Sequence, residues 1–156
     1  MNLPIITYRG AKSADRDWLF GLKRATMRNY VSAIFGWDDV EQQQWFEEKF
    51  DPGQIRIIQV DGVDAGQLKV ERHELDVYLA QIEILPRFQN GGIGSHVIRS
   101  IVEDARKENK FVRLQVLRSN PARRLYERLG FSVQETTATH FKMKTTAGNQ
   151  TSPATR

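Results

Sequence analysis

Residues 82–95 read IEILPRFQNGGIGS, and this segment is the most informative part of the sequence. It begins as the end of an apolar strand, stops at Pro86, and passes through a polar, glycine-rich segment into an amphipathic helix. Strand, loop and helix in this order place unpaired backbone N–H groups at the positive end of a helix dipole, where anions bind. The stretch therefore predicts a loop that holds an anionic group such as a pyrophosphate.

The three glycines of this loop support that interpretation. Gly91, Gly92 and Gly94 carry no side chains that would keep a phosphate away from the N–H donors. The alternative is a tight connection in which the glycines only relieve crowding. Two familiar phosphate loops are excluded, because the sequence lacks a Gly-Lys-Ser/Thr ending and lacks a further glycine separated from Gly94 by two residues.

Outward from the loop, apolar periodicity predicts the element order βααβββαβαββ and hence a mixed α/β (α+β) fold. We expect one domain over residues 1–144 and a disordered tail over residues 145–156. Asp61-Gly62 predicts a hairpin turn. The helices are expected to open at Ser13, at Asp38, after the glycine loop and at Pro121. Strands are expected at residues 4–9, 55–60, 65–72, 75–85, 112–117, 131–135 and 139–144.

Composition excludes several classes of protein. The chain has 156 residues and no Cys, so disulfides, thiolate metal sites and Cys nucleophiles are ruled out. The first residues lack a basic segment followed by an apolar one, and no apolar run approaches about 18 residues. We therefore expect a cytoplasmic protein that does not enter a membrane.

The net charge of +4 is unevenly distributed. Residues 87–130 hold ten Lys and Arg against four Asp and Glu, a net charge of +6, which leaves −2 for the rest of the chain. This fits a phosphorylated ligand, although such charges often only solvate helix faces. Nucleic acid is not expected, because no recognisable binding motif accompanies the arginines.

Two segments together carry a resemblance to the GNAT family of acetyl-CoA-dependent N-acetyltransferases. Residues 89–94, Gln-Asn-Gly-Gly-Ile-Gly, resemble the family's Gln/Arg-x-x-Gly-x-Gly/Ala loop. Residues 119–131, Ser-Asn-Pro-Ala-Arg-Arg-Leu-Tyr-Glu-Arg-Leu-Gly-Phe, resemble its Asn-x-x-Ala-x-x-Leu-Tyr-x-x-x-Gly-Phe segment. The resemblance covers residues 4–144, with its specific motifs confined to residues 82–131.

The resemblance implies a fold in which the strands at 75–85 and 112–117 run parallel and splay apart around the cosubstrate acetyl-CoA, with no metal. The pantetheine arm would bond to the backbone of Leu85 and its neighbour Ile84. Asn120 would contact the cosubstrate, Arg123 would lie near its 3′-phosphate, and Tyr126 would face its sulfur. The pyrophosphate would be held by the loop residues Gln89, Asn90, Gly91, Gly92, Ile93, Gly94 and Ser95.

Acetyl transfer to an amine needs a base, a polarised carbonyl and an acid for the leaving thiolate. Glu83 is the candidate base, because Tyr78, Ala80, Ile82 and Ile84 form an apolar face that leaves Glu83 on the other face, near the carboxyl end of its strand. Its alternative is an exposed or salt-bridged carboxylate. The backbone N–H of Leu85 is the candidate donor to the thioester carbonyl.

Tyr126 is the candidate acid, and its alternative is a core tyrosine within the helical stripe formed with Ala122, Leu125 and Leu129. The three histidines could act as acids or bases near neutral pH, but their spacing indicates no catalytic or metal-binding role. They are His73, His96 and His140.

The acceptor is open: a small-molecule or peptide amine, for which residues 34–39 offer aromatic and acidic groups. Trp37, Trp45 and Phe46 are otherwise expected to be buried helix faces. A non-catalytic acyl-CoA-binding sensor is the alternative function. The terminal hairpin and the strand edges also offer a surface for a homodimer.

Overall fold

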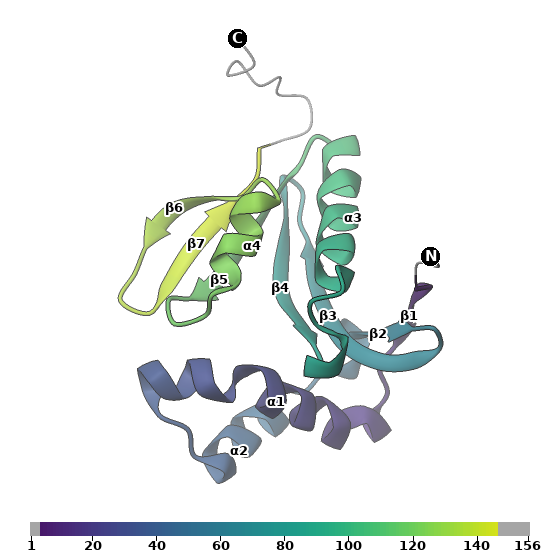
Figure 1. Cartoon of the computed structure of the whole chain (residues 1–156), viewed down its shortest axis with the longest axis vertical. Helices are drawn as coiled ribbons and strands as arrows, with labels where there is room; N and C mark the ends of the chain where they lie inside the picture. The colour runs from purple at the N-terminus through teal and green to yellow at the C-terminus, as the bar shows by residue number, and fades with distance from the viewer. Residues whose placement is uncertain (1–3, 147–156) are drawn as a thin grey trace. The chain divides into compact units, whose positions relative to one another are not determined.

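The elements follow one another in the order βααβββαβαββ that the sequence predicts (Figure 1). The computed structural model describes residues 4–146. The strands form one mixed sheet in the order β1-β2-β3-β4-β5-β7-β6. They are β1 (Ile6–Gly10), β2 (Arg56–Val60), β3 (Val63–Arg72), β4 (Asp76–Ile84), β5 (Phe111–Leu117), β6 (Ser132–Thr136) and β7 (His140–Lys144). The helices are α1 (Arg16–Phe35), α2 (Asp39–Lys49), α3 (Ile93–Lys107) and α4 (Ala122–Arg128). The predicted mixed α/β fold is confirmed.

The chain divides into two units, each built from two segments. Among the described residues, the first unit contains residues 4–70 and 81–93, and the second contains residues 71–80 and 94–146. The division falls within β3, within β4 and at the start of α3.

The first unit contains an antiparallel meander. β1 pairs with β2 from Ile6 opposite Val60 onward, and β2 pairs with β3. Between β2 and β3, Asp61 and Gly62 both have positive φ, at 51° and 83°. Two such residues are what a type I′ hairpin turn requires, so the turn predicted from Asp-Gly is confirmed.

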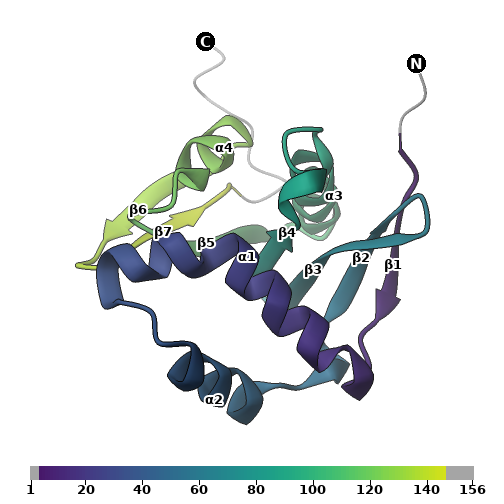
Figure 2. The ribbon, with the colours of Figure 1, turned by 60° about the horizontal axis from the view of Figure 1, so that its bottom comes forward.

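Helices α1 and α2 cover apolar side chains of this meander. Leu19 and Leu22 of α1 form a buried cluster with Ile55 and Ile57. Figure 2 shows α1 and α2 as two rods joined by a short link. Phe46 of α2 packs against Phe20 of α1, with ring centroids 5.5 Å apart and ring planes tilted by 56°.

Two expectations about these helices are corrected. Ser13 does not cap α1 but begins a short 3-10 turn, η1 (Ser13–Asp15), and α1 starts at Arg16. The side chain of Trp45 is 51% exposed, and the buried residue of α2 is the polar Gln42. Asp38 does cap α2 as expected, by accepting a hydrogen bond from the Glu41 N–H at 3.0 Å.

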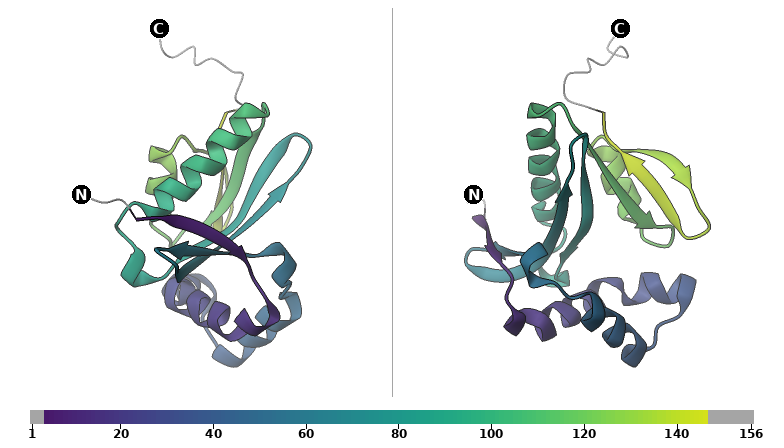
Figure 3. Two further views of the ribbon diagram at one scale, coloured as in Figure 1. Left: turned by 90° about the vertical axis from the view of Figure 1, so that its right-hand side faces the viewer. Right: turned by 180° about the vertical axis from the view of Figure 1, so that it is seen from behind.

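The second unit contains β5, β7 and β6 in adjacent positions (Figure 3, right). β6 and β7 form the predicted terminal hairpin. The start of β4 pairs in parallel with β5 over three residues, Asp76–Tyr78 opposite Phe111–Arg113. β4 continues beyond this short ladder to Ile84 and β5 to Leu117.

Thr145, where the sequence predicts that a tail begins, is buried. It is 3% exposed, its N–H donates to the carbonyl of Val112, and its Oγ1 accepts from the N–H of Val112. The remainder of the predicted tail, from residue 147, lies outside the described residues.

Candidate functional site

Strand β4 buries a different face from the one its sequence indicates. Val77, Leu79 and Glu83 are buried, whereas the even-numbered residues are only partly so and Gln81 is exposed. Glu83 therefore lies on the inward face with two apolar residues. The alternative of an exposed or salt-bridged carboxylate is wrong, because Glu83 is 8% exposed and no ion pair to it is found among the described residues.

One hydrogen bond and one nearby charge define the environment of Glu83. Its Oε1 accepts from Gln67 Nε2 at 2.8 Å. Burial raises the pKa of the Glu83 carboxyl above its usual range, while the hydrogen bond from Gln67 and the charge of Lys23 on α1 oppose this effect. Burial also lowers the pKa of Lys23. A carboxyl group with a raised pKa is suited to accept a proton.

The sequence pattern does not point to Gln67. Its contact with Glu83 joins two strands 16 residues apart, and strand register is not readable from local pattern. The available signal is the preceding Gly66, because glycine inside a strand marks close approach of another backbone. A Cβ at Gly66 would overlap the carbonyl oxygen of Glu83.

The backbone of Leu85 is not available in the way expected from the sequence. Its N–H donates to the carbonyl of Ala65 at 2.8 Å, and its own carbonyl accepts from the N–H of Phe88. The expectation that this N–H polarises a thioester carbonyl is therefore wrong, because it is already bonded within the sheet. Successive residues of a strand direct their N–H groups to opposite edges, so the N–H of Ile84 points away from β3.

The glycine loop is anchored at its first residue and has free space beside its glycines. Gln89 anchors the loop, because its Nε2 donates to the carbonyl of Ile84 at 2.8 Å. Asn90 and Gly92 have positive φ, 66° and 86°, so two nearly adjacent residues turn their backbone in the left-handed sense. Such loops can direct several N–H groups to one point.

Crowding does not explain the glycines of this loop. A Cβ placed on Gly91, Gly92 or Gly94 would meet no atom within 4 Å. The positive φ of Gly92 favours glycine, but the other two positions have neither that conformation nor a neighbour that excludes a side chain. The alternative of a purely steric role is therefore wrong for Gly91 and Gly94.

In the second unit, Tyr126 of α4 is buried at 9% exposure. Its ring meets Phe131 edge to face, with centroids 5.8 Å apart. Its hydroxyl makes no hydrogen bond to any residue in the described part of the chain, and burial raises its pKa to about 12. The hydroxyl therefore stays protonated at neutral pH, and it donates its proton to no residue within 4–146.

Asn120 and Arg123 both have partners in the second unit. The Asn120 Oδ1 accepts from the N–H of Ala122, the first residue of α4, at 2.9 Å. Arg123 is paired with Glu127 at 3.2 Å and lies over the ring of Phe141, with its guanidinium carbon 4.4 Å from the centroid. Both side chains are therefore held in place by the chain itself.

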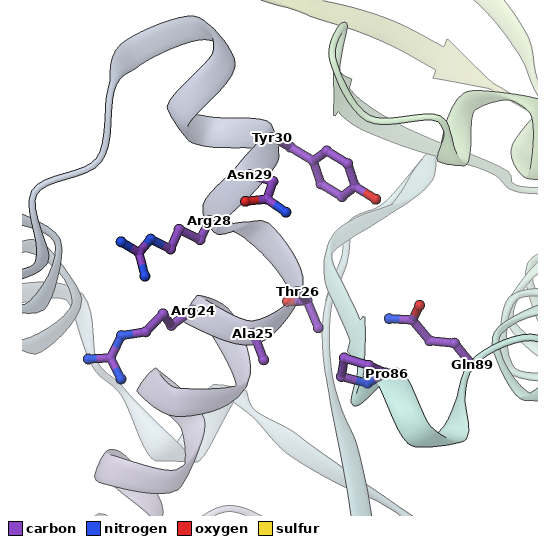
Figure 4. Close-up of a pocket in the computed structure, with 8 residues that line it drawn as sticks. All are labelled: Arg24, Ala25, Thr26, Arg28, Asn29, Tyr30, Pro86 and Gln89. Carbon is purple, nitrogen blue, oxygen red and sulfur yellow. The ribbon is translucent and has the colours of Figure 1, made fainter.

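The first unit also contains a cavity of about 300 Å³ (Figure 4). Tyr30 of α1 and Gln89 extend toward it from opposite sides, whereas the guanidinium groups of Arg24 and Arg28 point away. Its walls are Arg24, Ala25, Thr26, Arg28, Asn29, Tyr30, Pro86 and Gln89. The cavity is polar, and none of these residues is a carboxylate.

The expected acidic group for an amine, Asp39, is already paired. Its Oδ1 accepts from Trp37 Nε1 at 2.6 Å and from Arg24 Nε at 3.3 Å. These contacts, with Trp37 contributing most, hold the pKa of the Asp39 carboxyl below its usual range. The aromatic and acidic residues at 34–39 therefore stabilise the link between α1 and α2.

Within residues 4–146, no group of three or more acidic or histidine side chains is placed to hold a metal ion. Nor does any helix of that part of the chain combine the length and apolar character needed to cross a membrane.

Together, the mixed sheet, the open glycine loop before α3 and the buried carboxyl of β4 match the plan of an acyltransferase. The sequence matches the acetyltransferase (GNAT) family over residues 22–131. The chain belongs to this family, and the resemblance carried by its two motifs is confirmed. No curated protein matches the chain.

Solved structures share the fold at low sequence identity. PaiA N-acetyltransferase from Thermoplasma acidophilum, in complex with coenzyme A, is 18% identical with a TM-score of 0.72, covering 91% of this chain and 99% of that one. Ard1 from Thermoplasma volcanium is 16% identical with a TM-score of 0.61, covering 90% and 97%. Naa50 from Arabidopsis thaliana, in complex with the bisubstrate analogue CoA-Ac-MVNAL, is 14% identical with a TM-score of 0.62, covering 90% and 98%. At these identities the likeness is one of fold.

Proposed function

We propose that this protein transfers the acetyl group of acetyl-CoA directly to a primary amine, with Glu83 as the base and Tyr126 as the acid. The observation that carries the proposal is the buried Glu83 carboxyl, with its raised pKa, on the strand that leads into the open glycine loop. Two solved structures of the same fold are described as complexes with coenzyme A or a coenzyme A conjugate.

The glycine loop fits the pyrophosphate of acetyl-CoA. The space next to Gly91, Gly92 and Gly94 is free of protein atoms, and the loop precedes the N-terminus of α3, where backbone N–H groups and the helix dipole favour an anion. Further contacts are proposed for Ile84, Asn120 and Arg123. Leu85 is left out, because its N–H and its carbonyl are both bonded within the chain. The basic Arg123 would reach a phosphate only by sharing its charge between that phosphate and Glu127.

The first step that the chain performs is removal of a proton from the acceptor. An alkyl ammonium has a pKa near 10.4, so it is mostly charged at neutral pH and must lose a proton before its nitrogen can attack. Glu83 accepts that proton, because its raised pKa lies closer to the pKa of the ammonium than the pKa of an exposed carboxylate does. When bound, acetyl-CoA supplies the acetyl group as an activated thioester.

The remaining tasks fall to a backbone N–H and to Tyr126. The N–H of Ile84 is proposed to stabilise negative charge on the carbonyl oxygen, in place of Leu85, whose N–H is bonded to Ala65. The Tyr126 hydroxyl is proposed to donate its proton to the leaving sulfur. The excess proton on the nitrogen that has attacked then passes to the tyrosinate, which leaves a neutral amide and restores the hydroxyl. Direct transfer in a ternary complex needs no covalent intermediate on the chain, in keeping with the absence of Cys.

The acceptor is a small-molecule or peptide amine. The polar cavity lined by Tyr30 and Gln89 is proposed to bind its polar groups, because it adjoins Pro86 at the end of β4. Hydrogen bonding, more than a charged carboxylate, would select the acceptor there, since the cavity has no acidic wall among the described residues.

Thermal unfolding in the presence of acetyl-CoA and an amine panel monitored for thiol release test the proposal together. Saturating acetyl-CoA, at about 100 times its Kd, is expected to stabilise the protein by about 2.7 kcal/mol. Thiol release that appears only when an amine is present supports transfer. A stabilised protein that acetylates no amine would indicate the acyl-CoA-binding sensor instead.

A further inference from the structure

The side chain of Gln67 holds the buried carboxyl of Glu83, and the base role proposed above gives this contact a function. Gln67 comes from β3 and Glu83 from β4, and Nε2 donates to Oε1 at 2.8 Å. The two residues are 2% and 8% exposed. Water therefore contributes little to their orientation, and each side chain fixes the other.

The second polar atom of the Gln67 amide lacks a partner. Oε1 is buried and accepts no hydrogen bond within the described part of the chain. An unpaired buried carbonyl is unfavourable, so its presence calls for a reason. An amide has one donor end and one acceptor end, whereas a carboxyl group only accepts when ionised and gains a donor when protonated. Nε2 suits the carboxylate, and Oε1 suits the carboxylic acid.

We infer that Gln67 is a positioning residue that keeps the Glu83 carboxyl in one orientation through its proton cycle, with Nε2 donating to the carboxylate and Oε1 accepting from the acid. When Glu83 takes the proton, an N–H bond of the acceptor ammonium breaks and its electron pair stays on nitrogen. An O–H bond forms on Glu83. Half a turn of the amide then brings Oε1 to the new donor, and the contact is kept.

Three influences act on the Glu83 charge besides Gln67. Burial favours the neutral acid, and the charge of Lys23 on α1 favours the carboxylate. Lys49 on α2 acts on Lys23 in turn, because two cations disfavour each other's charge. Within this balance the Nε2 donor favours the carboxylate. Removing it is therefore expected to raise the pKa of Glu83.

The experiment is a carbon-13 NMR titration of the Glu carboxyl groups in the full chain without ligand, with the Glu83 signal identified by its loss in Glu83→Gln. Gln67→Met keeps the length of the side chain and removes both polar ends. The matched control is Gln59→Met, which removes an amide bonded at 2.9 Å to a different carboxylate, Asp64. We expect the Glu83 midpoint to rise by about one pH unit in Gln67→Met and to stay unchanged in Gln59→Met.

Two further measurements keep the inference testable if Gln67→Met fails to fold. In Gln67→Glu, two carboxyl groups share one proton, so the pair is expected to titrate in two steps with the upper step above the wild-type midpoint. In the wild-type protein, the side-chain amide protons of Gln67 are expected to titrate with the Glu83 midpoint. A flat amide profile, or a Glu83 midpoint unmoved in folded Gln67→Met, overturns the inference.

Enzyme kinetics then separate this inference from the proposed function. The acid limb of kcat/KM is expected to move to higher pH in Gln67→Met by the same amount as the NMR midpoint. An acid limb that stays at the wild-type pH also overturns the inference. If the wild-type protein acetylates no amine at all, the proposed function fails, whatever the NMR midpoints show.

Discussion

Gly66 lies directly against the backbone carbonyl of Glu83, with no room for a side chain between β3 and β4. The same approach brings the neighbouring Gln67 amide to the Glu83 carboxyl. The position of the proposed base therefore depends on the absence of a Cβ at one strand residue. This links the packing of the sheet to the chemistry proposed for β4.

Gly66→Ala is expected to destabilise the protein by about 1–3 kcal/mol or more, because the new methyl group forces the two strands apart. It should also lower kcat, since Glu83 moves with its backbone. Gly10→Ala in β1 is the control, because a Cβ there meets no atom within 4 Å. Urea unfolding compares the two variants. Equal stability of Gly66→Ala and Gly10→Ala would contradict the described packing.

Glu83→Gln is expected to stabilise the protein at about pH 8 while abolishing most of its activity. The pKa of Glu83 is higher in the folded state than its unfolded value of 4.5. Below pH 4.5 the carboxyl is protonated in both states, so its burial carries no ionisation penalty. The protein loses stability as the pH rises through the folded-state pKa. A neutral amide avoids that loss. Denaturation at about pH 8 and pH 4 measures the difference, which should shrink toward the lower pH. A variant less stable than wild type at pH 8 would argue against the raised pKa.

Tyr126→Phe is expected to lower kcat by about 10²-fold or more without weakening acetyl-CoA binding. Since its pKa is about 12, the hydroxyl remains protonated across an ordinary assay range, so the wild-type enzyme should show no alkaline limb from this group. The stability should hardly change, because the removed hydroxyl has no partner among residues 4–146. Steady-state kinetics and isothermal titration calorimetry test this pair of effects. Unchanged kcat would leave Tyr126 with a packing role alone.

Two glycine variants separate folding from cosubstrate binding in the loop. Gly92→Ala is expected to lower stability by about 1 kcal/mol, because φ is 86° there. Gly91→Ala should leave the free protein unaffected, since its Cβ enters open space without a positive φ. Both methyl groups should reduce the thermal shift that acetyl-CoA produces. A full shift in Gly91→Ala would show that this space is not used by the ligand.

The elements could be predicted well because their signals are local. The positive φ values of Asp61 and Gly62 follow from their residue types, and the α3 helix follows from apolar spacing. The two GNAT motifs also lie within continuous segments, so residue order alone is enough to recognise the family.

The errors concern properties that depend on strand pairing and packing. The apolar pattern of β4 places Glu83 on the less apolar face, but the folded chain buries Glu83 and brings Gln67 of β3 to it. The N–H of Leu85 is expected to be free, but the same pairing commits it to Ala65. Trp45 is expected to be buried from its residue type, yet the packing of α2 leaves it exposed.

Mass spectrometry of acetyl-CoA and an amine panel, incubated with the wild-type protein and with Glu83→Gln, tests the proposed acetyl transfer. With the wild-type protein we expect an acetylated amine formed in equal amount to free coenzyme A, and with Glu83→Gln a yield at least about 10²-fold lower. Equal yields from the two proteins, or acetyl-CoA that binds without any amine becoming acetylated, would disprove the transfer with Glu83 as its base.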